Sequence, residues 1–215
     1  MPTTVLSLTF NAVQENTYLV FDQDTREAII FDPGCYTAAE ERRLVATVEE
    51  HSLRPARLLN THCHFDHVFG NRFVAETYGL ELGIHELEQP LLEAAPVVVS
   101  TYGMPPMDPS PAPGYFIAAG EEITLGRATL RALFCPGHSP GHLCFHNAAE
   151  GYLIGGDVLF NGSIGRTDLP LGDHDTLLGS IMTQLLPLPD ETVVHCGHGP
   201  ATTIGKERRS NPFLR

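Results

Sequence analysis

The stretch "NTHCHFDHVFG", residues 60–70, places three histidines and one aspartate within six positions. It follows "ARLL", residues 56–59, a short apolar run that predicts a buried strand. Imidazole and carboxylate groups together suit zinc, iron or manganese, whereas softer sites use thiolates. His62 and His64 are two residues apart, a spacing that chelates one ion from a loop but not from a straight helix. We therefore expect residues 61–67 to form a metal-binding loop, unlike the helical H-E-x-x-H motif of metalloproteases.

Three further apolar runs, far apart in the sequence, also end at a histidine or an aspartate. "LRALFC" is followed by Pro136-Gly137-His138, "YLIGG" by Asp157, and "TVVHC" by Gly197-His198. Strand ends that converge on one edge of a sheet are where α/β folds place their chemistry. A shared carboxylate would let two ions sit about 3.5–4 Å apart with a water between them that ionises near neutral pH. The candidate ligands are His62, His64, Asp66, His67, His138, Asp157 and His198.

The first half of the chain predicts strands followed by helices. "TVLSLTF", "NTYLVFD" and "EAIIFD" are typical of a strand meander. A helix is predicted over 37–51, where Thr37 and Glu40 have the spacing of a capping box. A second helix is predicted over 68–78, with Gly79 as its stop.

The second half repeats this pattern after a proline-rich segment, residues 103–114, which we expect to be an exposed loop. Strands are predicted at "EEITL", "ATLRALF", "HLCFHN", "GYLIGG" and "ETVVH", with a helix over 173–186. Two sheets packed together, with helices outside, are expected from this order. The fold class is therefore α/β, in a single domain spanning residues 1–215.

Composition excludes several classes of function. The net charge of −13 disfavours nucleic-acid binding, and only "GKERR" at 205–209 is a basic run. The N-terminus has no signal-peptide pattern, and no apolar run has the length of a membrane span. Five cysteines without a C-x-x-C pair predict reduced thiols, and hence a cytoplasmic protein.

The order of these motifs resembles the metallo-β-lactamase superfamily: H-x-H-x-D-H, then a histidine after P-G, then G-D, then G-H. Within it, "GDVLFNGSIGRTDLPLGD", "CGHGP" and "NPFL" are most similar to the glyoxalase II branch, in particular to its short, single-domain, hydroxyacylglutathione hydrolase-like members. The similarity runs from "ENTY" at 15–18 to "NPFLR" at 211–215. It implies an αββα sandwich with the metals at one edge. One ion would be held by His62, His64 and His138, the other by Asp66, His67 and His198, and Asp157 would bridge them.

The resemblance also implies a reaction, the hydrolysis of S-D-lactoylglutathione or a related small anionic thioester. Its cofactors would be two divalent ions, with zinc expected first and iron or manganese as alternatives. A bridging hydroxide would attack the carbonyl, and Asp66 would be a catalytic residue that orients it or moves its proton. Longer members carry a C-terminal helical domain that supplies much of the glutathione pocket, and we expect no such domain here.

Two substrate contacts are also predicted, Arg166 in "GSIGRTDLP" and Tyr18 in "ENTY". The alternatives are an ion pair between Arg166 and Asp168, and strand packing for Tyr18. Two other functions stay open on the same scaffold. A lactone hydrolase would use the same hydroxide, and a persulfide dioxygenase, which "GRTDLP" also resembles, would bind one iron through His62, His138 and Asp157.

Overall fold

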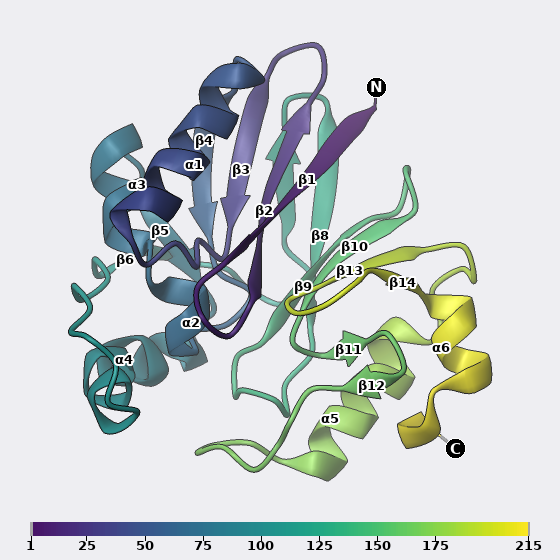
Figure 1. Ribbon diagram of the computed structural model, residues 1–215. Helices are drawn as coiled ribbons and strands as arrows, with labels where there is room; N and C mark the ends of the chain where they lie inside the picture. Colours follow the sequence, from purple (N-terminus) through teal and green to yellow (C-terminus); the bar gives the residue numbers. More distant parts are fainter. Residues whose placement is uncertain (1, 215) are drawn as a thin grey trace.

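Two six-stranded sheets pack face to face, and helices cover the outer face of each (Figure 1). This computed structural model describes residues 2–214. The first sheet has the order β1 (Thr3–Phe10), β2 (Glu15–Asp22), β3 (Glu27–Phe31), β4 (Arg54–Leu59), β5 (Leu82–Ile84) and β6 (Pro113–Phe116). The second has the order β14 (Thr202–Thr203), β13 (Val193–Cys196), β10 (Tyr152–Gly156), β9 (Leu143–Asn147), β8 (Ala128–Phe134) and β7 (Glu122–Leu125). A separate hairpin joins β11 (Leu159–Phe160) to β12 (Ser163–Ile164).

The helices bury one apolar face each against a sheet, which produces three hydrophobic layers. The first sheet is covered by α1 (Ala38–Glu50), α3 (Asn71–Tyr78) and α4 (Gln89–Thr101), and the second by α5 (His174–Ser180) and α6 (Ile204–Ser210). The central layer lies between the sheets, where the Phe31 and Phe145 rings are 4.9 Å apart. The predicted αββα sandwich is therefore confirmed.

Strand direction brings the predicted site together. In the first sheet, β3 and β4 are parallel. In the second, β13 is parallel to β10, while β9 runs antiparallel to both β10 and β8. Consequently β8, β10 and β13 all run the same way, and the segments that follow them emerge at one edge of the sheet.

Two local predictions are confirmed in detail. Thr37 caps α1 in a full capping box with Glu40. Gly79 ends α3 in the left-handed conformation, with φ of 66°. The predicted helix over 68–78 is interrupted, however, and α2 (Phe65–Val68) is separated from α3 near Gly70. A Cβ on Gly70 would collide with Cys35 Sγ, and the Gly70 N–H donates to Pro33 O at 2.7 Å, so this close contact requires glycine.

The proline-rich segment 103–114 is a largely exposed loop, as predicted, but it is also anchored to the rest of the fold. It has no helix or strand before β6, but Met107 is buried. Arg72 Nε donates to Pro109 O at 2.9 Å, and Asn71 Nδ2 donates to Ser110 Oγ at 3.2 Å. The segment therefore packs against α3.

Several elements have no counterpart in the sequence prediction, namely β5, β6, α4, α6 and β14. The helix predicted over 173–186 is α up to Ser180 and continues as a π turn, η2 (Ile181–Leu185). Short 3₁₀ turns are η1 (Glu86–Glu88) and η3 (Pro212–Leu214). Between residues 2 and 214, no helix combines the length and apolar character needed to cross a bilayer.

Candidate metal centre

The segment 61–67 is a loop only in its first part, which corrects the prediction. The chain leaves β4 at Leu59, and His62 and His64 lie on an irregular stretch. Asp66 and His67 then lie on the single turn of α2. The turn rotates these two side chains so that they face a different ligand group from His62 and His64.

The first group consists of His62, His64 and His138. His138 Nε2 lies 2.8 Å from His64 Nδ1 and 3.3 Å from His62 Nε2. Nitrogens that bind one tetrahedral zinc ion are expected about 3.4 Å apart, given Zn–N distances of about 2.0–2.1 Å. The His62–His138 pair therefore has the spacing of two ligands around one ion, whereas His64 and His138 are at hydrogen-bond distance.

The second group consists of Asp66, His67 and His198. Asp66 Oδ2 lies 3.1 Å from His198 Nε2 and 3.6 Å from His67 Nε2. These distances are short enough for the three residues to share one ion.

Asp157, which follows β10, lies between the two groups. Its Oδ2 is 3.5 Å from His138 Nε2 in the first group and 3.5 Å from His198 Nε2 in the second. Its Oδ1 is 3.5 Å from His67 Nε2. All seven residues predicted as ligands are thus brought together at one edge of the sandwich, and Asp157 has the position of a bridge.

The polar atoms of this cluster fit a bound cation. His67 Nε2 and Asp157 Oδ1 are buried and have no hydrogen-bond partner among the residues that the structure describes. A buried polar atom without a partner is costly, and a metal ion would satisfy both. A donor set of imidazole and carboxylate suits divalent zinc, iron or manganese.

The electrostatics of the two groups differ. Burial lowers the pKa of His62 and His138, and lowers the pKa of His64 to about 3. Burial also opposes charge on His67, but the carboxylates of Asp66 and Asp157 raise its pKa overall. The first group is therefore neutral at physiological pH, whereas the second attracts positive charge.

Hydrogen bonds orient the histidine rings. His138 donates from Nδ1 to Arg166 O at 2.7 Å, and His198 Nδ1 lies 3.1 Å from Val13 O. His142 is buried and accepts the Asp157 N–H at 3.0 Å. Such partners fix which ring nitrogen faces the metal.

Asp32, which follows β3, was not anticipated from the sequence. It accepts hydrogen bonds from Thr61 N at 2.7 Å and Thr61 Oγ1 at 2.6 Å, and His67 Nδ1 lies 3.2 Å from its Oδ2. This contact turns His67 Nε2 toward the second group. The available signal was "FDPG", residues 31–34, a strand end carrying an acidic residue like the others.

Two more buried acids were also missed. Glu15 Oε1 is 3.9 Å from His67 Nδ1, on the side away from the cluster. Glu88 has no exposed surface, and its carboxylate accepts backbone N–H groups next to the ligand histidines. Burial raises the pKa of Glu88, and the N–H groups of Cys63 and Gly141 act against that rise.

The two predicted substrate contacts lie in different environments. The Arg166 guanidinium is more than half exposed and forms a two-pronged pair with Asp168, with both N–O distances 2.7 Å. Tyr18 is buried between the sheets and donates its hydroxyl to Cys196 O at 2.6 Å. Arg166 is therefore open to solvent near His138, whereas Tyr18 has little surface for a substrate. Cys63 is buried and belongs to neither ligand group.

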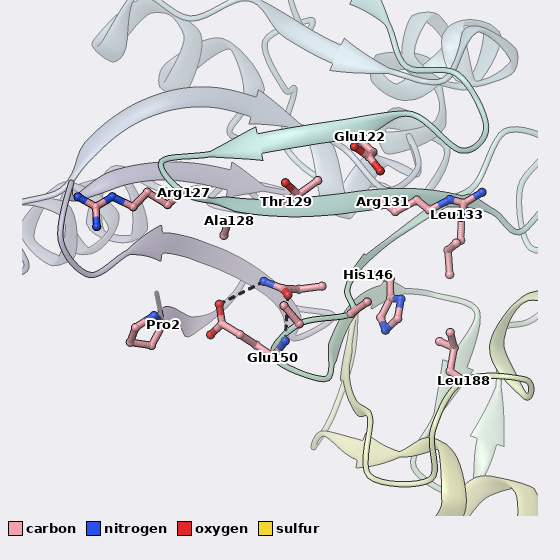
Figure 2. Close-up of a pocket in the computed structure, with 13 residues that line it drawn as sticks. Pro2, Glu122, Arg127, Ala128, Thr129, Arg131, Leu133, His146, Glu150 and Leu188 are labelled. Atoms are coloured by element: carbon pink, nitrogen blue, oxygen red, sulfur yellow. Dashed lines mark hydrogen bonds between the residues drawn. The ribbon is translucent and has the colours of Figure 1, made fainter.

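A cleft of about 760 Å³ lies elsewhere, on the outer face of the second sheet (Figure 2). Arg131, His146 and Leu188 are among the residues that line it. Its lining includes none of the seven clustered residues. The metal centre is therefore not part of this cleft.

Comparisons with known proteins agree with the geometry. The Metallo-beta-lactamase superfamily model matches residues 10–198. The chain is 42% identical over 204 residues to a Haemophilus influenzae protein named hydroxyacylglutathione hydrolase GloC, covering 94% of each chain. It superimposes on BLEG-1 B3 metallo-beta-lactamase with a TM-score of 0.90 and 37% identity, covering 98% of this chain and 99% of that one. It superimposes on TTHA1623 in a di-iron-bound form with a TM-score of 0.87 and 38% identity, covering 98% of this chain and 100% of that one.

The matched family, the sandwich and the cluster at its edge all lead to one assignment. The family model includes every one of the seven clustered residues, from His62 to His198. Members of this superfamily are metal-dependent hydrolases. The chain belongs to the metallo-β-lactamase superfamily.

Proposed function

We propose that this protein is a dinuclear metal-dependent thioester hydrolase that acts on S-D-lactoylglutathione or a similar small anionic thioester. The observation that carries the proposal is the pair of three-residue ligand groups with Asp157 within 3.5 Å of a histidine in each. The name of the Haemophilus influenzae relative, hydroxyacylglutathione hydrolase, supports the substrate class. Zinc is the expected metal, with iron or manganese as alternatives.

When bound, two divalent ions would lower the pKa of a water and polarise an acyl carbonyl. The seven side chains would hold the ions, and we assign Asp66 a further role. Its Oδ2 is 3.1 Å from His198 Nε2, and the residue keeps a small exposed surface, so it can accept a proton from an entering water. A thiolate leaves without a strong acid, so the chain needs no dedicated proton donor beside the leaving group.

The position of Arg166 supports the proposal that the substrate is anionic. Its carbonyl accepts the His138 N–H, which places the residue beside the first group, while its guanidinium faces solvent. In a chain with a net charge of −13, a local cation at this position would favour a carboxylate of the thiol carrier. Its pairing with Asp168 would hold the guanidinium in place until substrate binds.

We also propose a reducing compartment, in keeping with the cytoplasmic location expected from the sequence. All five cysteines are buried and free of disulfides. Unpaired thiols of this kind are typical of a reducing environment.

A persulfide dioxygenase is the competing function. His62, His138 and Asp157 form a two-histidine, one-carboxylate set, with His138 Nε2 3.3 Å from His62 and 3.5 Å from Asp157. Such an enzyme needs one iron and open positions for oxygen. The second group is complete as well, and that favours the two-ion hydrolase.

The test measures metal content and turnover on the same preparation. Metal-free protein is reloaded with zinc, iron or manganese and assayed with S-D-lactoylglutathione, with a simple lactone, and for oxygen uptake with glutathione persulfide. We expect two ions per chain and thioester hydrolysis that rises with the second ion. One iron per chain with oxygen uptake would overturn the proposal, and turnover of the lactone alone would replace the substrate class.

A further inference from the structure

A fully buried acid outside both ligand groups contacts the loops of the first group. Glu88 ends η1 and directly precedes α4, and it has no exposed surface. Burial of a carboxylate is unfavourable unless hydrogen bonds compensate it. The contacts of this side chain therefore indicate what it does in the fold.

Glu88 joins two loops that are distant in the sequence. Its Oε2 accepts the Cys63 N–H at 2.8 Å, and its Oε1 accepts the Gly141 N–H at 2.7 Å. Cys63 stands between His62 and His64 in the sequence, and Gly141 lies in the loop 135–142, which contains His138. One carboxylate thus links the segments that carry all three imidazoles of the first group.

The loop that contains His138 can approach Glu88 closely because residue 141 is a glycine. A Cβ on Gly141 would lie 3.0 Å from both Cγ and N of Glu88, and 2.9 Å from His85 Nδ1. These distances are tighter than ordinary van der Waals contact, so a larger residue would push the loop away. The absence of a side chain allows the backbone N–H to reach the carboxylate.

We propose that Glu88 is a positioning residue that assembles the first ligand group before any metal binds. It acts through backbone N–H groups, so it touches neither ion nor substrate. Asp32 has the corresponding position in the second group, where it contacts Thr61 and His67. The inference concerns the metal centre alone and holds whatever substrate is hydrolysed.

The first experiment compares Glu88→Gln with Glu86→Gln, an exposed acid two residues away on the same turn. Zinc binding is titrated in competition with a chelator, and a His64→Ala reference identifies the binding step of the first group. We expect Glu88→Gln to weaken that step by about 10–100-fold, the usual effect of removing a partner that orients metal ligands. The other step and the circular dichroism spectrum should be unchanged, and Glu86→Gln should resemble the wild type. Equal weakening of both steps, or of neither, would overturn the proposal.

The second experiment uses the wild-type protein, so it does not depend on the folding of a variant. Amide hydrogen exchange is measured without metal, and we expect the Cys63 and Gly141 N–H groups to be protected. Exchange as fast as in an open loop would mean that Glu88 does not hold them before metal binds, and the inference would be wrong. Because neither readout involves turnover, failure here is distinct from failure of the proposed thioesterase activity.

Discussion

The histidine pKa values shift in opposite directions in the two ligand groups of the metal centre. The first has only imidazoles, and burial lowers the pKa of each, so His62, His64 and His138 are neutral donors without any metal. The second combines Asp66 with two histidines whose pKa values nearby carboxylates raise. The first group is thus ready for an ion, whereas His67 and His198 of the second must lose their protons before an ion binds.

The supports behind the groups differ in the same way. Glu88 reaches the first group only through backbone N–H groups. Asp32 contacts the His67 ring directly and lies within the charge network of the second. His198 is also the more open ligand, since 28% of its side chain is exposed against none of His67. The second group is therefore in contact with solvent through His198.

Asp66→Ala should have the largest effect, because it removes a ligand and the proposed proton acceptor together. We expect turnover to fall about 10²–10⁴-fold, the range for loss of a general base, with little change in KM. Steady-state kinetics with the zinc-loaded variant provides the measurement. Equal losses in kcat and in substrate affinity would contradict this role and place Asp66 in binding instead.

Asp32→Asn should have a smaller effect, larger in the second group, where Asp32 contacts His67 directly, than in the first, which it reaches only through Thr61 and His62. The amide has one acceptor oxygen in place of two, so its NH2 group must face either Thr61 N or the side where Thr61 Oγ1 and His67 Nδ1 lie. We expect the second zinc step to weaken about 10–100-fold, as for other partners of a ligand histidine. Chelator competition checks it, and Glu88→Gln is the matched control that weakens the opposite step. If Asp32→Asn weakened the first step instead, the separation of the two groups would be wrong.

The sequence predicted most of what lies at strand ends. The strands that end near His138, Asp157 and His198 were recognisable because each apolar run is followed by a polar residue. Parallel strands end at the same edge of a sheet, so these residues were expected to lie together. The supporting acids were harder to find. Asp32 follows a strand in the same manner, but it lacked a neighbouring histidine, and Glu88 lies in a segment with no motif at all.

Local geometry could not be predicted because tertiary contacts decide it. The α2 turn begins within the histidine motif and ends at Val68, and Gly70, which follows it, must be glycine because it contacts residues 33–35 closely. The proline-rich segment has no hydrophobic periodicity. Its packing on α3 through Arg72 and Asn71 could therefore not be predicted from the sequence. In both cases the decisive partner is distant in the sequence.

Tyr18→Phe should have the smallest effect on zinc binding. It tests the difference between the two ligand groups with a residue that belongs to neither of them. The hydroxyl donates to Cys196 O at 2.6 Å, two residues before His198 on the chain, and burial raises its pKa, so it stays a donor. Asn16 Nδ2 also donates to Cys196 O, at 3.1 Å, so the carbonyl keeps a partner in the variant. We therefore expect a loss of about 1 kcal/mol in the free energy of unfolding, the usual net value of one hydrogen bond.

The matched control for this change is Tyr152→Phe, which removes another buried hydroxyl, 2.8 Å from Thr3 Oγ1 and away from the metal centre. Urea unfolding should show at least as large a loss for Tyr152→Phe as for Tyr18→Phe, because the Tyr152 hydroxyl also accepts from Asn147 Nδ2 at 3.3 Å. Only Tyr18→Phe should also weaken the second zinc step, by less than about tenfold, since it acts on His198 through the backbone rather than on the ring. If Tyr152→Phe weakened the second zinc step as much as Tyr18→Phe does, the cause would be the loss of overall stability. The position of β13 would then not determine zinc binding by the second group.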